Sequence, residues 1–182
     1  MTVDTDVDPG LVRRAMGQFA TGVTVITSVT GNAEPVGCTV SAFASLSLDP
    51  PLVLVCIGRD RRMHDPLTSG PGFTVNVLAH DQRDVAYAFA RAGRDRFARL
   101  AVRPGRHGIP RIDGALAQIQ CDLHGVLDGG DHAIVVGRVR QVELAPGEPL
   151  LYSQGAFLDV PDADWERVTA TAPSEWLLSA PW

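Results

Sequence analysis

The sequence predicts a mainly β fold built as an antiparallel β-barrel, and three observations support this prediction. Six segments are dense in β-branched residues or alternate between apolar and polar side chains, as strands do. Short turns rich in Gly, Asn and Asp separate several of these segments. Helical patterns are few and do not alternate with the strands, which argues against a parallel βαβ architecture.

Composition limits the class of protein. The chain has 182 residues, of which 45% are hydrophobic and 20% charged, so it fits one domain with a packed core. Its net charge of -5 argues against a nucleic-acid binder, although eight arginines lie between 83 and 111. An uncharged apolar run of about 18 residues is absent, so we expect no membrane-spanning helix. The acidic N-terminus does not resemble a secretion signal, and we expect a cytoplasmic protein.

The N-terminal third predicts one helix and two extended segments. Asp8 and Pro9 suit a helix cap and first turn, and Gly22 suits the end of that helix. Its one apolar face comprises Val12, Met16, Phe19 and Ala20. A strand over 23–29 follows, and a turn at 31–32 leads into one long extended segment over 35–48.

The middle of the chain predicts two more strands and a second helix. Residues 52–58 are apolar on both faces, which indicates a buried strand, and residues 72–79 alternate. A helix is expected from about Asp81, because Val85 and Phe89 lie one turn apart. The Arg- and Gly-rich region 91–111 is expected to be a loop.

The segments 115–127 and 132–144 predict a long antiparallel hairpin joined by a tight turn at 128–131. In the first of them, alternation places one set of side chains inward and the other outward. We expect Ile119, Cys121 and Leu123 to face inward, and Gln118, Gln120 and Asp122 to face outward.

Familiar catalytic constellations are missing from the sequence: it contains no GxSxG, HExxH, Walker loop or GxGxxG. The five histidines lack metal-ligand spacing, so no metal site is predicted. Cys38, Cys56 and Cys121 are odd in number and form no CxxC pair, which favours three free thiols in a reducing compartment.

Three segments could line a binding site, and each has a plainer interpretation. Within 36–51, hydroxyl groups recur at strand spacing and suit a phosphate or the edge of a heteroaromatic ring, or they form an exposed strand face. These hydroxyl groups belong to Thr39, Ser41, Ser45 and Ser47. Within 128–137, a His follows a double-Gly turn, which either fixes it beside open space or is an ordinary hairpin end.

The third segment, 56–66, runs from a strand into an arginine cluster after Gly58. Guanidinium groups at a strand end can grip a phosphate or pyrophosphate. They can equally pair with Asp60 and Asp65 in a solvated loop. The arginines are Arg59, Arg61 and Arg62.

Six pieces of the sequence, in order, resemble the flavin reductase family with an FMN-binding split-barrel fold. They are residues 13–27, 35–57, 73–79, 95–97, 129–139 and 149–157, so the resemblance covers roughly residues 11–158. It implies a six-stranded antiparallel Greek-key split β-barrel with a few flanking helices, assembled as a homodimer. It also implies one domain over 1–160 and a C-terminal tail over 161–182 that holds three tryptophans.

The same resemblance implies the site residues. Those around the flavin ring and ribityl chain would be Gly37, Cys38, Thr39, Ser41 and Ala42. Those continuing toward the phosphate would be Cys56, Ile57, Gly58, Arg59, Arg61 and Arg62, with further contacts from Asn76, His80, Arg96 and Phe97. On the nicotinamide side would lie Tyr152 and His132, the one candidate catalytic residue.

The activity implied is an NAD(P)H:flavin oxidoreductase. It would reduce free FAD or FMN with NADH or NADPH and deliver reduced flavin to a partner flavin-dependent monooxygenase. This would explain the missing acid–base residues, because the two cofactors supply the redox chemistry. Two alternatives keep the flavin but change the activity: an FMN-retaining oxidase similar to pyridoxamine-phosphate oxidases, and a non-catalytic flavin-binding protein.

Overall fold

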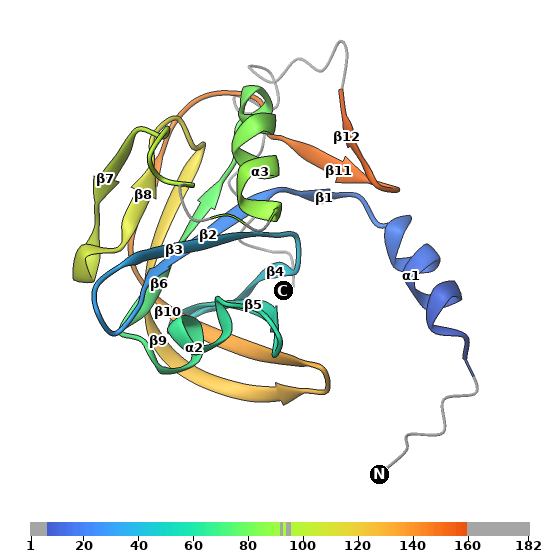
Figure 1. The fold of residues 1–182 in the computed structure, drawn as a ribbon, viewed down its shortest axis with the longest axis horizontal. Coiled ribbons are helices and arrows are strands. Elements are labelled where there is room, and N and C mark those ends of the chain that lie inside the picture. Colours follow the sequence, from blue (N-terminus) through green and yellow to red (C-terminus); the bar gives the residue numbers. More distant parts are fainter. Residues whose placement is uncertain (1–6, 92, 94–95, 160–182) are drawn as a thin grey trace.

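The fold is mainly β, as expected, with one large antiparallel sheet and few helices (Figure 1). The computed structural model describes residues 7–91, 93 and 96–159. Seven strands form the large sheet, in the spatial order β3 (Pro35–Val40), β2 (Thr24–Val29), β6 (Gly72–Val77), β9 (Ala117–Gly129), β10 (His132–Leu144), β5 (Pro51–Gly58) and β4 (Phe43–Leu48).

Smaller elements flank this sheet. A three-stranded sheet contains β1 (Thr21–Gly22), β11 (Leu151–Ser153) and β12 (Ala156–Leu158), and a hairpin contains β7 (Val102–Pro104) and β8 (Pro110–Ile112). The helices are α1 (Pro9–Gly17), α2 (His64–Ser69) and α3 (Arg83–Ala90), with short 3-10 turns η1 (His80–Gln82) and η2 (Arg106–Gly108). None of the helices in the described ranges is long and apolar enough to cross a bilayer.

The large sheet curls because its two edge strands are consecutive in the chain. β3 pairs with β2 at one edge, β4 pairs with β5 at the other, and only Ser41 and Ala42 separate β3 from β4. The expected single segment 35–48 therefore breaks at this link, because it changes partner there, and the sheet has seven strands where six segments were expected. The core inside the curl includes Val55, Phe73 and Val135, all fully buried.

The first helix begins as predicted. Asp8 caps α1, and its carboxylate accepts a hydrogen bond from the Gly10 backbone N–H at 3.0 Å. The helix ends at Gly17, earlier than the expected Gly22. The apolar side chains of the helix and of the residues just after it are not covered by the described part of this chain: Met16 is 66% exposed and Phe19 is 75% exposed.

The expectation that Gln118 and Gln120 face outward is wrong, because they are only 3% and 2% exposed. The region 91–111, expected to be a loop, contains β7 and leads into β8, and this hairpin covers their face of the sheet. The Gln118 side chain donates to the Ile112 carbonyl, and the Gln120 side chain accepts from the Arg106 backbone N–H at 2.7 Å. Each buried amide therefore has a hydrogen-bond partner in the covering segment.

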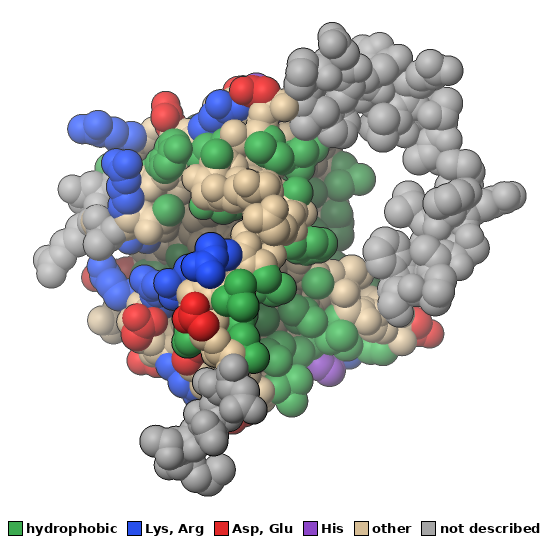
Figure 2. Space-filling view, turned by 90° about the vertical axis from the view of Figure 1, so that its right-hand side faces the viewer, with side chains coloured by type: hydrophobic (Ala, Val, Ile, Leu, Met, Phe, Trp, Pro, Cys, Tyr) green, Lys and Arg blue, Asp and Glu red, His purple; other side chains and the backbone are tan. Residues whose placement is uncertain are grey.

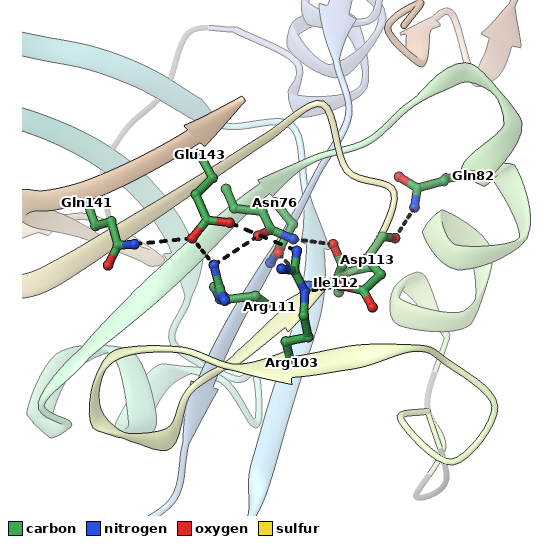
Figure 3. A network of polar contacts seen from close by, with 9 residues as sticks. Asn76, Gln82, Arg103, Arg111, Ile112, Asp113, Gln141 and Glu143 are labelled. Atoms are coloured by element: carbon green, nitrogen blue, oxygen red, sulfur yellow. Dashed lines mark hydrogen bonds and ion pairs between the residues drawn. The ribbon is translucent and has the colours of Figure 1, made fainter. Parts of the chain in front are cut away.

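Asn76 belongs to the same buried polar layer. Its amide donates to the Val25 carbonyl at 3.0 Å and accepts from the Ile112 backbone N–H at 2.8 Å. Figure 3 shows it beside the ion pair between Arg111 of β8 and Glu143 of β10, which ties the hairpin to the sheet. The predicted flavin contact Asn76 is thus fully buried and bonded within the fold.

Asp122 is a second point at which the covering segment is attached to the sheet, because two arginines and a histidine surround its carboxylate. His107, Arg106 and Arg140 contact it at 3.0, 3.1 and 2.7 Å. Hydrogen bonds from His107, then from Arg106 and Arg140, lower the pKa of Asp122 to about 2. Since η2 supplies two of these partners, the contacts hold the covering segment to β9 and β10.

This cluster predicts a pH-dependent contribution to stability. We expect Asp122→Asn to lower the free energy of unfolding by about 1 kcal/mol at pH 7, because the folded state favours the ionised carboxylate. Because its pKa is lowered in the folded state, the ionised Asp122 carboxylate stabilises the fold above about pH 4. This contribution is lost as the pH falls toward 2 and the carboxylate becomes protonated. Urea unfolding at several pH values measures the difference. Asp49→Asn, at an exposed position without an ion pair in the described residues, is the control, and a pH-independent difference would contradict the assignment.

Candidate functional site

A half-open cleft of about 450 Å³ lies between the β3–β4 link, the end of β5 and α3. Most of the predicted binding residues line it: Cys38, Thr39, Ser41, Ala42, Cys56, Ile57, Gly58, Arg61, His132 and Tyr152. The link and β5 are joined by a hydrogen bond from the Cys56 N–H to the Ala42 carbonyl at 3.0 Å. Because Val55 points into the core, alternation turns the Cys56 side chain to the cleft face.

Helix α3 forms a wall of the cleft that the sequence analysis did not identify. The residues it contributes are Ala86, Tyr87, Phe89 and Ala90. The Thr39 hydroxyl donates to the Ala86 carbonyl at 2.7 Å and so fixes the helix against β3. The small residues Ala86 and Ala90, one turn apart, were the available signal, since they let a helix approach another element closely.

Gly37 supports this wall rather than lining the cleft. A Cβ atom at Gly37 would lie 2.7 Å from the Phe89 ring, so only glycine allows α3 to pack this close to β3. Phe97 packs against the same ring, with ring centroids 5.1 Å apart. Arg96 donates to the Gly37 carbonyl at 2.7 Å. These three predicted contact residues therefore lie behind the wall and hold it in place.

Three aromatic rings group beside the cleft. Tyr87 and Tyr152 each meet Phe157 edge to face, with centroids 5.0 and 5.6 Å apart. All three rings line the cleft, and both tyrosines are partly exposed. Phe157 was missed by the sequence analysis although it lies in a matching segment. Such rings offer apolar area and π-faces to a planar ligand.

His132 stands where β10 begins, directly opposite Gly58 of β5. Its Nδ1 lies 2.7 Å from a carboxylate oxygen of Asp131, and this hydrogen bond lowers the pKa of Asp131. Its Nε2 is 3.7 Å from the position a Cβ atom on Gly58 would occupy. The imidazole is therefore held over Gly58 at the cleft, which favours the site interpretation over an ordinary hairpin end.

The arginine cluster divides between two roles. Arg61 lines the cleft and also an adjoining hollow of about 480 Å³, and its ion pair with Asp60 is loose at 3.4 Å. Arg59 lines only the hollow and is bonded to the β9–β10 turn. Arg62 lines neither space, and the Asp65 carboxylate contacts His64 instead of an arginine.

Other predicted residues lie away from the cleft. His80 contacts Asp159 at 2.8 Å and Arg83 at 3.1 Å, at the start of α3. Ser45 and Ser47 flank a register shift in β4 and do not line the cleft, unlike Thr39 and Ser41. Only the first two of the four expected hydroxyl side chains therefore line the cleft.

The Cys38 thiol in the cleft is not an activated nucleophile. Burial raises the pKa of Cys38 to about 12, although Arg96 and Arg61 oppose the shift. Cys38 and Cys56 are both free. The described residues hold no cluster of three or more His, Cys, Asp or Glu side chains suited to a metal ion. What the cleft offers is apolar walls, backbone groups and one arginine at its edge, which suit a planar ring that carries a phosphate.

Known proteins resemble this chain in sequence and fold. The family model described as flavin reductase like domain matches residues 16–161. The flavin-dependent monooxygenase reductase subunit HsaB of Mycobacterium tuberculosis is 38% identical over 177 residues, which cover 96% of this chain and 91% of HsaB. A Rhizobium meliloti relative is 39% identical over 95% of this chain, but the chain spans only 55% of its length.

A solved structure agrees with these matches. SgcE6, the NADH:FAD oxidoreductase of Streptomyces globisporus C-1027, is known in complex with NAD and FAD fragments. It superimposes with a TM-score of 0.80 at 42% sequence identity, covering 88% of this chain and 99% of SgcE6. Fold, sequence and the order of the matching segments agree over most of the chain, which therefore belongs to the flavin reductase like domain family.

Proposed function

We propose that this protein is an NADH-dependent flavin reductase that reduces free FAD or FMN and delivers the reduced flavin to a partner flavin-dependent monooxygenase. The observation that supports it most is the half-open cleft, in which an apolar floor and wall face His132. Reductase components and an NADH:FAD oxidoreductase among the relatives support the same activity. An open cleft suits a flavin that arrives oxidised and leaves reduced.

The residues of the cleft fit a flavin by shape and by chemistry. Its volume lies within the range of small-molecule sites, and its walls are mostly apolar with few polar groups. When bound, the flavin supplies the redox chemistry, because it accepts a hydride from reduced nicotinamide. The β3–β4 link would bind the edge of the flavin ring, and Cys56, in the floor of the cleft, would contact the ring face. Arg61 would bind the phosphate.

The chain's contribution to the reaction is placement. His132, held by Asp131 over Gly58, would contact the nicotinamide on the open side of the ring. Tyr152, at the rim, would help to exclude water from the same side. Two stacked rings need only a defined separation and a dry contact, so no acid–base residue is required.

We also propose NADH over NADPH, and a homodimer. The first rests on the NADH:FAD oxidoreductase among the solved relatives. The second rests on exposed apolar side chains of α1 and of the residues just after it, because Val12, Met16 and Phe19 have no covering element in the described chain. Figure 2 shows hydrophobic side chains gathered on the face that is turned to the right in Figure 1. A second copy would cover apolar surface that a monomer leaves in water.

Three finer features of the resemblance stay predictions. They are the Greek-key form of the barrel, the domain over 1–160, and the role of the tail over 161–182, which lies outside the described residues. The large sheet itself has seven strands and not six. We further propose a cytoplasmic location, which the free thiols of Cys38, Cys56 and Cys121 support.

The proposed activity predicts a simple assay result. NADH oxidation by the purified protein should rise strongly when free FAD or FMN is added, because flavin is a substrate and not a fixed group. Absorbance of NADH measures the rate, with NADPH as the comparison. A protein that stays yellow through desalting and ignores added flavin would be the FMN-retaining oxidase. One that binds flavin without oxidising NADH would be the non-catalytic binder, and either result would overturn the proposal.

A further inference from the structure

The turn between β9 and β10 is held mainly by polar contacts. Figure 1 shows this hairpin projecting from the body of the molecule. Residues 126–132 at its end are all exposed, so buried apolar packing does not fix the turn. Gly130, with φ +76°, occupies the left-handed region that this tight turn requires. A projecting end of this kind is the part of a hairpin expected to open locally.

Arg59 donates three hydrogen bonds to this turn. Its Nε donates to the Gly130 carbonyl at 2.9 Å, and its Nη2 donates to the Asp128 carboxylate at 2.5 Å. Its backbone N–H donates to the Asp131 carbonyl at 3.0 Å. The Asp128 carboxylate also accepts from the Gly130 N–H at 3.3 Å, and Arg59 lowers the pKa of Asp128. Side chain and backbone of one residue therefore fix both ends of the turn.

The hydrogen bonds from Arg59 to the turn determine the position of His132. His132 is the first residue after the turn, it pairs with Gly58, and its imidazole is hydrogen-bonded to Asp131. Both Asp131 and His132 are exposed, so neither is held by burial. Arg59 directly follows Gly58, the residue that pairs with His132. The hydrogen bonds of Arg59 to the turn therefore set where the His132 imidazole lies relative to the cleft.

Arg59 is a poor candidate for binding a phosphate. Two of its donor groups are engaged by the turn, and the Asp128 carboxylate beside it would repel an anion. Arg61 differs, because it lines the cleft and pairs only loosely with Asp60. The two arginines, two residues apart, thus have separable tasks.

We propose that Arg59 and Asp128 are positioning residues that hold His132 at the nicotinamide side of the cleft. This rests on the proposed function for the identity of the ligand that His132 meets. It replaces the interpretation of Arg59 as a phosphate ligand and leaves that role to Arg61. It assigns Asp128, which the sequence analysis did not single out, to the same unit.

The first test uses the protein without ligand and does not depend on its activity. In Arg59→Ala and in Asp128→Ala, amide hydrogen exchange over residues 129–133 should quicken about tenfold, since each variant releases the same turn. The double variant should quicken exchange by less than the product of the two single effects, because both single variants remove the Arg59–Asp128 contact. Arg138→Ala, at an exposed β10 position without a side-chain partner in the described residues, is the matched control. Unchanged exchange in both single variants would refute the positioning role, whatever the protein catalyses.

The second test separates nicotinamide from flavin. Both single variants should raise KM for NADH about five- to tenfold and leave KM for flavin within about twofold, as His132→Ala should. A phosphate-binding Arg59 gives a different pattern: Arg59→Ala raises KM for flavin, while Asp128→Ala lowers it or has no effect. That second pattern would overturn the proposal. Should no variant or wild-type protein oxidise NADH, the proposed function fails while hydrogen exchange still decides the positioning role.

Discussion

Cys56→Trp should weaken the binding of FAD and FMN by at least about 100-fold, because an indole at this position fills the cleft. Cys56 pairs with Ile134 of β10, and its N–H is bonded to Ala42, so its backbone cannot move aside. The side chain points away from the core residues Val55 and Ile57, and the added ring can extend only into the cleft. Flavin titration followed by fluorescence measures the loss directly, without an assay of turnover.

The matched control for this variant is Leu54→Trp. Leu54 lies on the same strand and the same face, and it is similarly half-buried, but it does not line the cleft. Thermal unfolding of both variants separates a blocked cleft from a damaged fold. If Leu54→Trp and Cys56→Trp retained equal affinity for flavin while both stayed folded, the cleft would not be the flavin site.

Local features of the fold were predictable because their causes are local. Asp8 caps α1 through a contact two residues away, and the turn at 128–131 is recognisable from its own glycines, of which Gly130 has a positive φ. The hairpin of β9 and β10 follows from alternation on both sides of that turn. Strand identity was therefore predictable from sequence over most of the large sheet, and α3 from its one-turn spacing.

Features that depend on distant segments were not predictable. Alternation correctly separates Gln118 and Gln120 from Cys121, but it cannot tell which face meets water. The deciding element is the β7–β8 hairpin, whose sequence lacks a clear pattern because many of its contacts to the sheet are ion pairs and hydrogen bonds from its backbone. Asn76, which the resemblance places at the flavin site, accepts a hydrogen bond from the Ile112 N–H, and this pairing with a residue far along the chain could not be predicted from sequence.

The candidate site shows the same division. Thr39 and Ser41 were identified from their spacing and do line the cleft, whereas Ser45 does not, because the chain changes pairing partner at Ser41 and Ala42. The wall supplied by α3 was missed because its contact with β3 depends on the missing side chain of Gly37. The face of a strand on which a side chain lies can be predicted from sequence, but the packing of a helix across that strand depends on tertiary contacts.

Gly137→Ala should lower the free energy of unfolding by about 1–3 kcal/mol, because it overfills the core. Gly137 lies in the middle of β10, where a Cβ atom would approach the Phe73 ring to 2.4 Å and the Cys121 Cβ to 2.8 Å. Both neighbours are fully buried, so neither can turn into solvent. Chemical denaturation measures the change, which runs against the gain that alanine normally gives over glycine in a strand.

Gly125→Ala is the matched control for this substitution. Gly125 lies in β9 opposite Val136, and nothing lies within 4 Å of a Cβ atom placed there, so its stability should change by no more than about 0.5 kcal/mol. Phe73→Leu should offset part of the cost of Gly137→Ala, because the smaller side chain vacates the contested space. Additive losses in the double variant, or equal losses at Gly125 and Gly137, would mean that steric contact with Phe73 does not set the requirement for glycine. The close approach of the Phe73 ring of β6 to β10, across β9, would then not depend on glycine at 137.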